Sequence, residues 1–230
     1  MRPLILALAI LAAPALAAPA LAADAQHPTV LELFQSQGCS SCPPANANIN
    51  ALAQRPDVLA LSFAVTYWDG LGWKDRFAQP LFTQRQWDYA HGFGNAQVWT
   101  PQVVVNGRAN ITGTQAAPLQ ALIAGNDRGN GGPALTVAAA AVDIAGKAAR
   151  PASVWLVRYD PQAIAVPIKA GENAGKTLPH RNIMREFIKL GDWAGGPAHY
   201  ALPHATRAGL ATAVLVQSGR GGPIIAAKRG

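Results

Sequence analysis

The chain has 230 residues, of which 50% are hydrophobic, 13% are charged and only two are cysteines, and its formal net charge is +7 at pH 7. This length and apolar content suit one large or two small domains with a hydrophobic core. No run of lysine and arginine interleaved with aromatic residues accompanies the positive charge, so the composition does not indicate a nucleic-acid-binding protein.

The N-terminal segment, residues 1–23, is typical of a secretory signal peptide. Arg2 is followed by an apolar stretch rich in Ala and Leu, which ends in a small-x-small pattern at residues 20–22. Pro14 and Pro19 disfavour an uncleaved membrane-spanning helix. We therefore expect a periplasmic or secreted protein with no stable membrane insertion after cleavage. In such an oxidising compartment the two cysteines can rest as a disulfide.

The two cysteines, Cys39 and Cys42, lie where a strand turns into a helix. The apolar run at residues 29–34 predicts a strand, and a helix is expected at about residues 45–54. A disulfide between cysteines two residues apart cross-links almost no chain, which favours a redox role. We expect Cys39, close to solvent and to the free amides of the helix N-terminus, to attack, and Cys42 to resolve the mixed disulfide. The two prolines after Cys42 predict that the helix kinks or restarts near Ser41.

An aromatic segment follows the second predicted strand, residues 58–66, and precedes a helical segment at residues 83–91. Tyr67, Trp68 and Trp73 fall at the end of the sheet where the CxxC pair is expected. They are candidates for an apolar rim that binds a peptide or a small thiol, with packing against the second half of the chain as the alternative.

The Thr100-Pro101 bond precedes a β-branched strand, residues 103–105, and an Asn-Gly hairpin turn. This arrangement is typical of the cis-proline loop of the thioredoxin fold, where it leaves the backbone of Thr100 free to pair with an extended peptide. A further strand to Ile111 and a final helix follow. Residues 24–125 therefore predict a thioredoxin-like α/β domain, with a β-α-β unit, a linking helix, a hairpin and a last helix.

A Gly-rich linker is expected at residues 126–133, and a small, mainly antiparallel β domain at residues 134–230, packed on the first domain. The segment 182–190 fits either a strand or a short helix. Strands are predicted at residues 135–144, 154–159, 163–168, 212–217 and 223–227.

Two polar segments of the second half have more than one interpretation. Gly171–Lys176 predicts a tight turn. His180-Arg181-Asn182 is a candidate either for anion binding or for capping the interface between the two domains.

Three segments, VLELFQSQGCSSCPPANANINALA, TYWDGLGWKD and GENAGKTLPHRNIMREF, resemble the secreted proteins of domain-of-unknown-function family 1223 over nearly the whole mature chain. That family is assigned a thioredoxin-like fold and has no established activity, so the resemblance implies a fold and a site without a substrate. The tryptophan and the charged residue that flank the motif of thioredoxins are missing here. Gln37-Gly38 precede the motif and Pro43-Pro44 follow it.

Glu32 is the one charged residue in the predicted strand 29–34. Burial of a carboxylate is costly unless the group has a partner or a task. In thioredoxins a buried carboxylate on this strand exchanges protons with the resolving cysteine, and Glu32 matches that place if one residue is inserted in the turn. An ion-paired or edge-facing glutamate is the alternative.

The sequence thus predicts a thiol–disulfide oxidoreductase that exchanges disulfides with protein or small-molecule thiols through Cys39 and Cys42. Glu32 is the third candidate catalytic residue, and the candidate substrate-binding residues are Thr100, Pro101, Trp68 and Trp73. No cofactor and no resident metal are expected, because the scattered histidines lack the spacing of a zinc site.

Two alternatives stay open. The reduced thiols would suit copper(I), with a distant histidine such as His91 as a further ligand. The disulfide would otherwise be structural, in a non-catalytic interaction module. The sequence predicts neither the direction of electron transfer nor the oligomeric state.

Overall fold

The computed structural model describes residues 22–230, so the expected signal peptide falls almost wholly outside the described residues. In chain order, the helices and strands are β1 (Thr29–Gln35), α1 (Cys42–Leu52), β2 (Val58–Ala64), α2 (Pro80–Gly92), β3 (Gln102–Val105), β4 (Ala109–Ile111), α3 (Ala116–Gly125), β5 (Ala134–Val137), β6 (Ala141–Ala145), β7 (Ala152–Asp160), β8 (Ile164–Pro167), β9 (Thr177–His180), β10 (Ile183–Trp193), β11 (Ala198–Ala201), β12 (Ala211–Ser218) and β13 (Ile224–Arg229).

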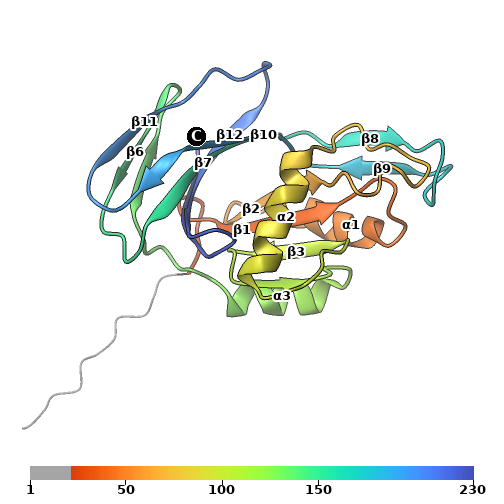
Figure 1. Cartoon of the computed structure of the whole chain (residues 1–230), viewed down its shortest axis with the longest axis horizontal. Coiled ribbons are helices and arrows are strands. Elements are labelled where there is room, and N and C mark those ends of the chain that lie inside the picture. Colours follow the sequence, from red (N-terminus) through yellow and green to blue (C-terminus); the bar gives the residue numbers. More distant parts are fainter. Residues whose placement is uncertain (1–21) are drawn as a thin grey trace, which may run out of the picture.

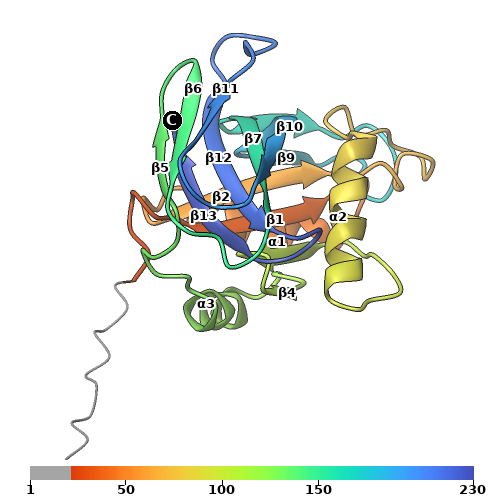
Figure 2. The ribbon, with the colours of Figure 1, turned by 60° about the vertical axis from the view of Figure 1, so that its left-hand side comes forward.

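The fold is mixed α/β, with one large mixed sheet and two small antiparallel sheets. The large sheet has eight strands in the order β13-β12-β7-β10-β2-β1-β3-β4, and the small sheets are β11-β6-β5 and β8-β9. β1 runs parallel to β2 and antiparallel to β3. Figure 1 shows α2 crossing one face of the large sheet, and Figure 2 shows the same arrangement from a second direction.

The alternation of side chains along β1 explains how helices cover both faces. Leu31 and Leu33 pack with Ala45 and Ile49 of α1 and with Leu119 of α3. The side chains between them in the sequence point to the opposite face, toward α2, because successive residues of a strand alternate between the faces of a sheet. The helices expected from the sequence are therefore present, with slightly different ends.

The N-terminus of α1 accommodates two consecutive prolines. The helix begins at Cys42 with Ser41 as its N-cap, so Pro43 and Pro44 both fall in the first turn. The amides of the first turn have no acceptor within a helix, and proline is therefore tolerated there. The predicted restart of the helix near Ser41 is confirmed.

The C-terminal half continues the same sheet. β10 lies beside β2, with Ile183 paired to Ser62, and the amide of Ser62 donates to the carbonyl of Asn182 at 3.0 Å. The C-terminal half is mainly antiparallel, as predicted, but it does not only pack on the first half, because β7, β10, β12 and β13 extend the N-terminal sheet. The segment 182–190 is a strand, and the predicted strand 135–144 is two strands, β5 and β6, that pair with each other.

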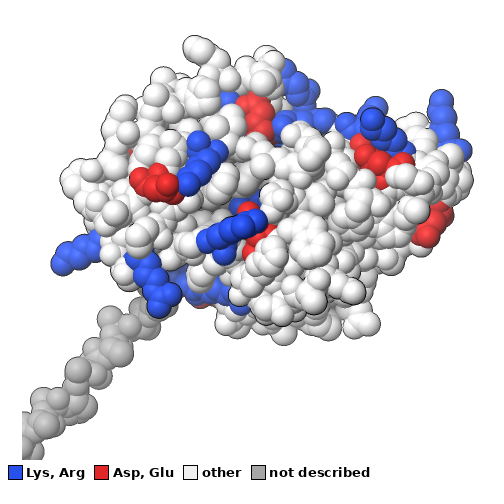
Figure 3. Space-filling view, in the orientation of Figure 1, with Lys and Arg blue, Asp and Glu red and all other residues white. Residues whose placement is uncertain are grey.

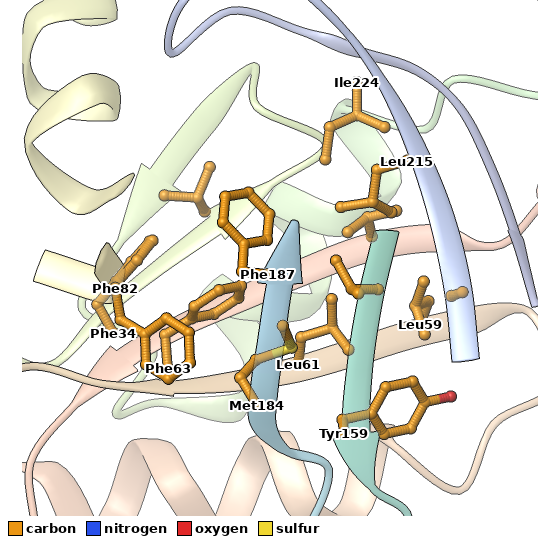
Figure 4. Packing of buried hydrophobic residues seen from close by; sticks show 14 of the residues in the cluster. Phe34, Leu59, Leu61, Phe63, Phe82, Tyr159, Met184, Phe187, Leu215 and Ile224 are labelled. Carbon is orange, nitrogen blue, oxygen red and sulfur yellow. The ribbon is translucent and has the colours of Figure 1, made fainter. Parts of the chain in front are cut away.

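One hydrophobic core is shared by both halves (Figure 4). Phe63 of β2 lies edge-on to Phe82 of α2 and to Phe187 of β10, with ring centroids 5.3 and 6.0 Å apart. Leu215 and Ile224, near the C-terminus, belong to the same cluster. The burial of large aromatic side chains dominates the energetics of such a core.

The expected linker, residues 126–133, is packed between the two halves. Arg128 donates to the carbonyl oxygens of Pro28 and Ala227 at 3.1 and 3.4 Å, and Asn106 donates to that of Asn126. The division into two domains stays a prediction about units of folding.

Charged side chains on the face in Figure 3 form small mixed groups separated by wide neutral areas. Arg220, in the turn between β12 and β13, forms an ion pair with Asp88 of α2. Within residues 22–230, no helix is both long enough and apolar enough to cross a membrane.

Candidate functional site

Cys39 and Cys42 form a disulfide between the end of β1 and the start of α1, with their Cα atoms 5.4 Å apart. Both side chains are buried, with 0% of Cys39 and 2% of Cys42 exposed. The expectation that Cys39 lies close to solvent is therefore wrong for the oxidised protein. The two serines between the cysteines are exposed instead, and the Ser41 hydroxyl lies 3.3 Å from the Cys39 sulfur.

Cys39 also lies outside the helix, three residues before its first residue. A helix N-terminus acts on charges within about its first turn. The sulfur of Cys39 is nevertheless bonded to that of Cys42, the first residue of the helix.

A buried carboxylate holds the turn before the disulfide. Asp75, in the loop between β2 and α2, accepts hydrogen bonds from the amides of Gln37 and Phe77, both at 2.9 Å. Its side chain is 1% exposed, and burial raises its pKa to about 6 despite these hydrogen bonds. Trp73 from the same loop donates its indole N–H to the side-chain oxygen of Gln37 at 2.9 Å.

The loop between β8 and β9 reaches the same turn from the C-terminal half. Glu172 accepts a hydrogen bond from the amide of Ser40 at 3.0 Å. The Asn173 side chain is fully buried and donates to the carbonyl oxygens of Gln37 and Cys39 at 2.9 and 2.8 Å. Figure 1 shows β8 and β9 at the same end of the molecule as α1.

The sequence does not predict Asp75, Glu172 and Asn173 as site residues. The one signal in the sequence is the polarity of the Gly171–Lys176 segment, which we interpreted as a tight turn. The turn is present, with the amide of Gly175 bonded to the carbonyl of Ile168 at 2.9 Å. Its polar side chains are used to hold the disulfide turn.

Trp68 links the disulfide turn to the Thr100-Pro101 bond, which is cis as predicted. The indole N–H of Trp68 donates to the hydroxyl of Thr100 at 2.7 Å. A Cβ atom built on Gly38 would lie 3.9 Å from the Cβ of Trp68 and 3.7 Å from the carbonyl oxygen of Trp73. The structure therefore brings both tryptophans to the turn that carries the cysteines, and Trp68 also contacts Thr100.

Trp73 has a second role. Its side chain packs against an apolar cluster that contains Val166, Ile168 and Leu178 from the β8–β9 hairpin. The alternative that one tryptophan packs against the C-terminal half is thus correct for Trp73.

Glu32 is bonded to residues of α2, and none of its hydrogen bonds reaches the CxxC turn. Its carboxylate forms a two-point ion pair with the guanidinium of Arg85 on α2, at 2.5 and 3.0 Å, and accepts a hydrogen bond from Tyr89. Since side chains alternate along β1, Glu32 faces α2 with Val30 and Phe34, whereas Cys42 begins α1 on the opposite face. The ion-paired alternative is the one observed.

Behind Cys42, a buried polar pair joins α1 to β9. Asn46, one turn after Cys42, donates to the carbonyl of Pro179 at 2.7 Å and lies 3.1 Å from Nδ1 of His180. Burial lowers the pKa of His180 to about 4, so its ring is neutral at pH 7. Arg181 bonds through its amide to Asn50. Of the two interpretations of segment 180–182, capping of the interface is the one that the contacts support.

A metal site is not evident in the part of the chain that the structure describes: no group of three or more His, Cys, Asp and Glu side chains is placed to hold an ion. His91, the histidine considered as a copper ligand, lies at the end of α2 beside Trp87, with ring centroids 6.0 Å apart.

Comparison with protein families gives one match, to a family described as "Protein of unknown function (DUF1223)", over residues 30–217. The chain belongs to this family. The matched range of the DUF1223 family contains both the disulfide and the β8–β9 loop that holds its turn. A search of curated proteins finds no significant match.

Two solved structures are similar to this DUF1223 protein. A crystal structure of a protein from Agrobacterium tumefaciens, determined by the Northeast Structural Genomics Consortium, is 30% identical, with a TM-score of 0.72 over 87% of this chain and 92% of that chain. HBP35 of Porphyromonas gingivalis is 12% identical, with a TM-score of 0.62 over 89% of this chain and 75% of that chain. At that identity, the likeness to HBP35 concerns the fold alone.

Proposed function

We propose that this protein is a thiol–disulfide oxidoreductase of the cell envelope, periplasmic or secreted, that acts through Cys39 and Cys42 without a cofactor. The observation that carries the proposal is the position of the disulfide. It joins cysteines only three positions apart, contributes almost no cross-linking, and occupies a turn that two other segments of the chain, the β2–α2 loop and the β8–β9 loop, hold in place.

The topology of the N-terminal half supports a thioredoxin-like unit in this proposal. β1, α1 and β2 form a parallel β-α-β unit, and the β3–β4 hairpin and α3 complete the order β2-β1-β3-β4. The disulfide follows the carboxyl end of β1, the edge of a parallel sheet where binding and catalytic groups gather.

The reaction begins with the reduced protein. The Cys39 thiolate attacks one sulfur of a substrate disulfide, the substrate S–S bond breaks, and the departing sulfur takes up a proton. Cys42, after losing its proton, then attacks the Cys39 sulfur of the mixed disulfide. The second substrate thiol leaves, and the Cys39–Cys42 disulfide is restored, so two electrons and two protons have passed to the substrate.

Access to the sulfurs requires movement in this scheme. Because neither cysteine has appreciable exposed surface in the oxidised state, a thiol must displace part of the covering loops before it reaches the disulfide. Tyr67 and Leu71, in the loop after β2 that also carries Trp68 and Trp73, are large hydrophobic residues with exposed side chains.

The test is catalysis of exchange by the mature, metal-free protein. The rate at which dithiothreitol reduces insulin disulfides, and the rate at which a reduced, unfolded protein gains disulfides, are measured with wild-type protein and with the C39S/C42S double variant as the matched control. We expect acceleration by the wild type in one of these assays and none by the variant.

Equal rates for the two proteins in both assays would reject the proposal. Tight copper(I) binding by the reduced protein, in competition with a strong chelator and in the absence of exchange, would instead support the copper-handling alternative.

A further inference from the structure

Two carboxylates hold the backbone amides on either side of Cys39. Glu172 Oε2 accepts from the amide of Ser40 at 3.0 Å, and Asp75 Oδ2 accepts from the amide of Gln37 at 2.9 Å. The two acidic residues come from different halves of the chain, and both meet the turn within two residues of Cys39. A thiolate at Cys39 would be a third negative charge in this small region.

The other charged groups around the turn do not reverse this balance. Lys176 lies one contact further away, with its ammonium group bonded to the side-chain oxygen of Asn173 at 2.9 Å. Asp69 accepts from the amide of Asp75 and adds negative charge, and Arg76 is an exposed neighbour of Asp75. No basic side chain in the described residues bonds directly to the turn at residues 37–40, whereas two carboxylates do.

Like charges disfavour ionisation of a thiol. Ionisation of a thiol stabilises the reduced form of the pair, so a thiol that ionises less readily makes the pair a stronger reductant. In the series of known dithiols, correspondingly, the protein with the most acidic thiol is the strongest oxidant. The acidic neighbours of Cys39 therefore act in the reducing direction.

Building on the thiol–disulfide function proposed above, we propose that Glu172 is a positioning residue whose carboxylate disfavours the thiolate of Cys39 and sets the pair as an electron donor to substrate disulfides. Each cycle passes two electrons and two protons from the dithiol to a substrate disulfide. A second dithiol, as electron donor, then reduces the Cys39–Cys42 bond and is itself oxidised.

The experiment is an equilibrium titration of the mature protein in buffers of reduced and oxidised glutathione, read by alkylation and mass spectrometry. E172Q retains an acceptor for the Ser40 amide and removes only the charge. We expect the equilibrium constant for reduction by glutathione to rise about three- to tenfold in E172Q, where tenfold corresponds to about 30 mV. D143N is the matched control, since Asp143 is an exposed acid on β6, paired with His199.

Screening gives a second readout. High salt weakens interactions between exposed charges, so in 1 M salt the difference between E172Q and wild type should shrink while D143N stays at the wild-type value. In the C42S background, the midpoint of the pH dependence of Cys39 alkylation should be lower with E172Q than without it.

The inference would be overturned if this equilibrium constant rose less than twofold in E172Q, or if it fell. This equilibrium measurement does not depend on catalysis. A shifted potential in a protein that exchanges no substrate disulfide would uphold the role of Glu172 and reject the proposed oxidoreductase function. An unshifted potential in an active protein would reject the role of Glu172 and uphold the oxidoreductase function.

Discussion

Asp75 and His180 should respond to acid in opposite directions. Burial raises the pKa of Asp75 from its ordinary value of 3.8 to about 6, and burial lowers the pKa of His180 from 6.5 to about 4. If the ordinary values hold in the unfolded chain, each shift of about two units corresponds to about 3 kcal/mol of unfolding free energy.

The two pKa shifts have opposite effects on stability. The folded pKa of Asp75 is above the unfolded one, so its contribution to stability is complete below pH 3.8 and is lost as the pH rises through about 6. The folded pKa of His180 is below the unfolded one, so its contribution is complete above pH 6.5 and is lost as the pH falls through about 4. Between pH 7 and pH 4, the two contributions nearly cancel in the wild type.

Single substitutions should expose both contributions. Between pH 7 and pH 4, D75N should lose about 3 kcal/mol more than the wild type, and H180Q should lose about 3 kcal/mol less. Urea unfolding at pH 7, 6, 5 and 4 gives these values by linear extrapolation. Comparing the change with pH, rather than the stability at one pH, removes the constant effect of the altered hydrogen bonds.

The exposed pair of Asp143 and His199 supplies the control, since D143N removes a carboxylate whose side chain is 62% exposed and which contributes little. Curves for D75N and H180Q that run parallel to the wild-type curve within about 1 kcal/mol, roughly the error of extrapolation, would refute the reasoning.

Four further predictions concern the disulfide and the core. The C42S protein should trap mixed disulfides through Cys39, and the C39S protein should not, as mass spectrometry of the adducts can show; equal trapping would reject the assigned order of attack. R85M should lower the free energy of unfolding by about 3–5 kcal/mol, because it leaves the buried carboxylate of Glu32 without its ion partner. E32Q should leave the reduction potential unchanged, whereas a shift would return Glu32 to the active site. N173A should speed the reduction of the disulfide by a water-soluble phosphine severalfold, because the turn then loses both bonds from Asn173 and, of its bonds to the β8–β9 loop, keeps only that to Glu172; an unchanged rate would mean that Asn173 does not guard the sulfurs.

Local sequence patterns were sufficient for the helices and strands of the first half. The alternating or continuous apolar runs of β1 and β2, the Asn-Gly turn after β3 and the two cysteines between a strand and a helix all act over a few residues. The pairing of β10 with β2 depends on a single bridge between Ile183 and Ser62. Nothing in the local pattern of either strand specifies that partner, so the continuity of the sheet could not be predicted.

The case of Glu32 shows what periodicity does and does not determine. The period of two along β1 predicts that Glu32 shares a face with Val30 and Phe34. It does not predict which face α1 will cover, and the role of Glu32 depended on that choice. Its actual partner, Arg85, is 53 residues away on α2.

The polar groups of the site were the least predictable part. The acceptor for the Ser40 amide is 132 residues further along the chain, in a loop whose sequence indicates only a turn. Loops have no periodicity from which the direction of a side chain can be read, so Glu172 and Asn173 could be recognised as a turn but not as contacts of the cysteines.

The C-terminal half supplies contacts to both the N-terminal sheet and the disulfide turn. Without β10, the strand β2 would be an edge of the sheet with unpaired backbone groups, and Phe63 would lose its contact with Phe187. Without the β8–β9 loop, the carbonyls of Gln37 and Cys39 would lose the Asn173 amide that satisfies them. The Gly-rich segment at residues 126–133 therefore joins two halves that share the large sheet, one of the hydrophobic clusters and the contacts that hold the disulfide turn.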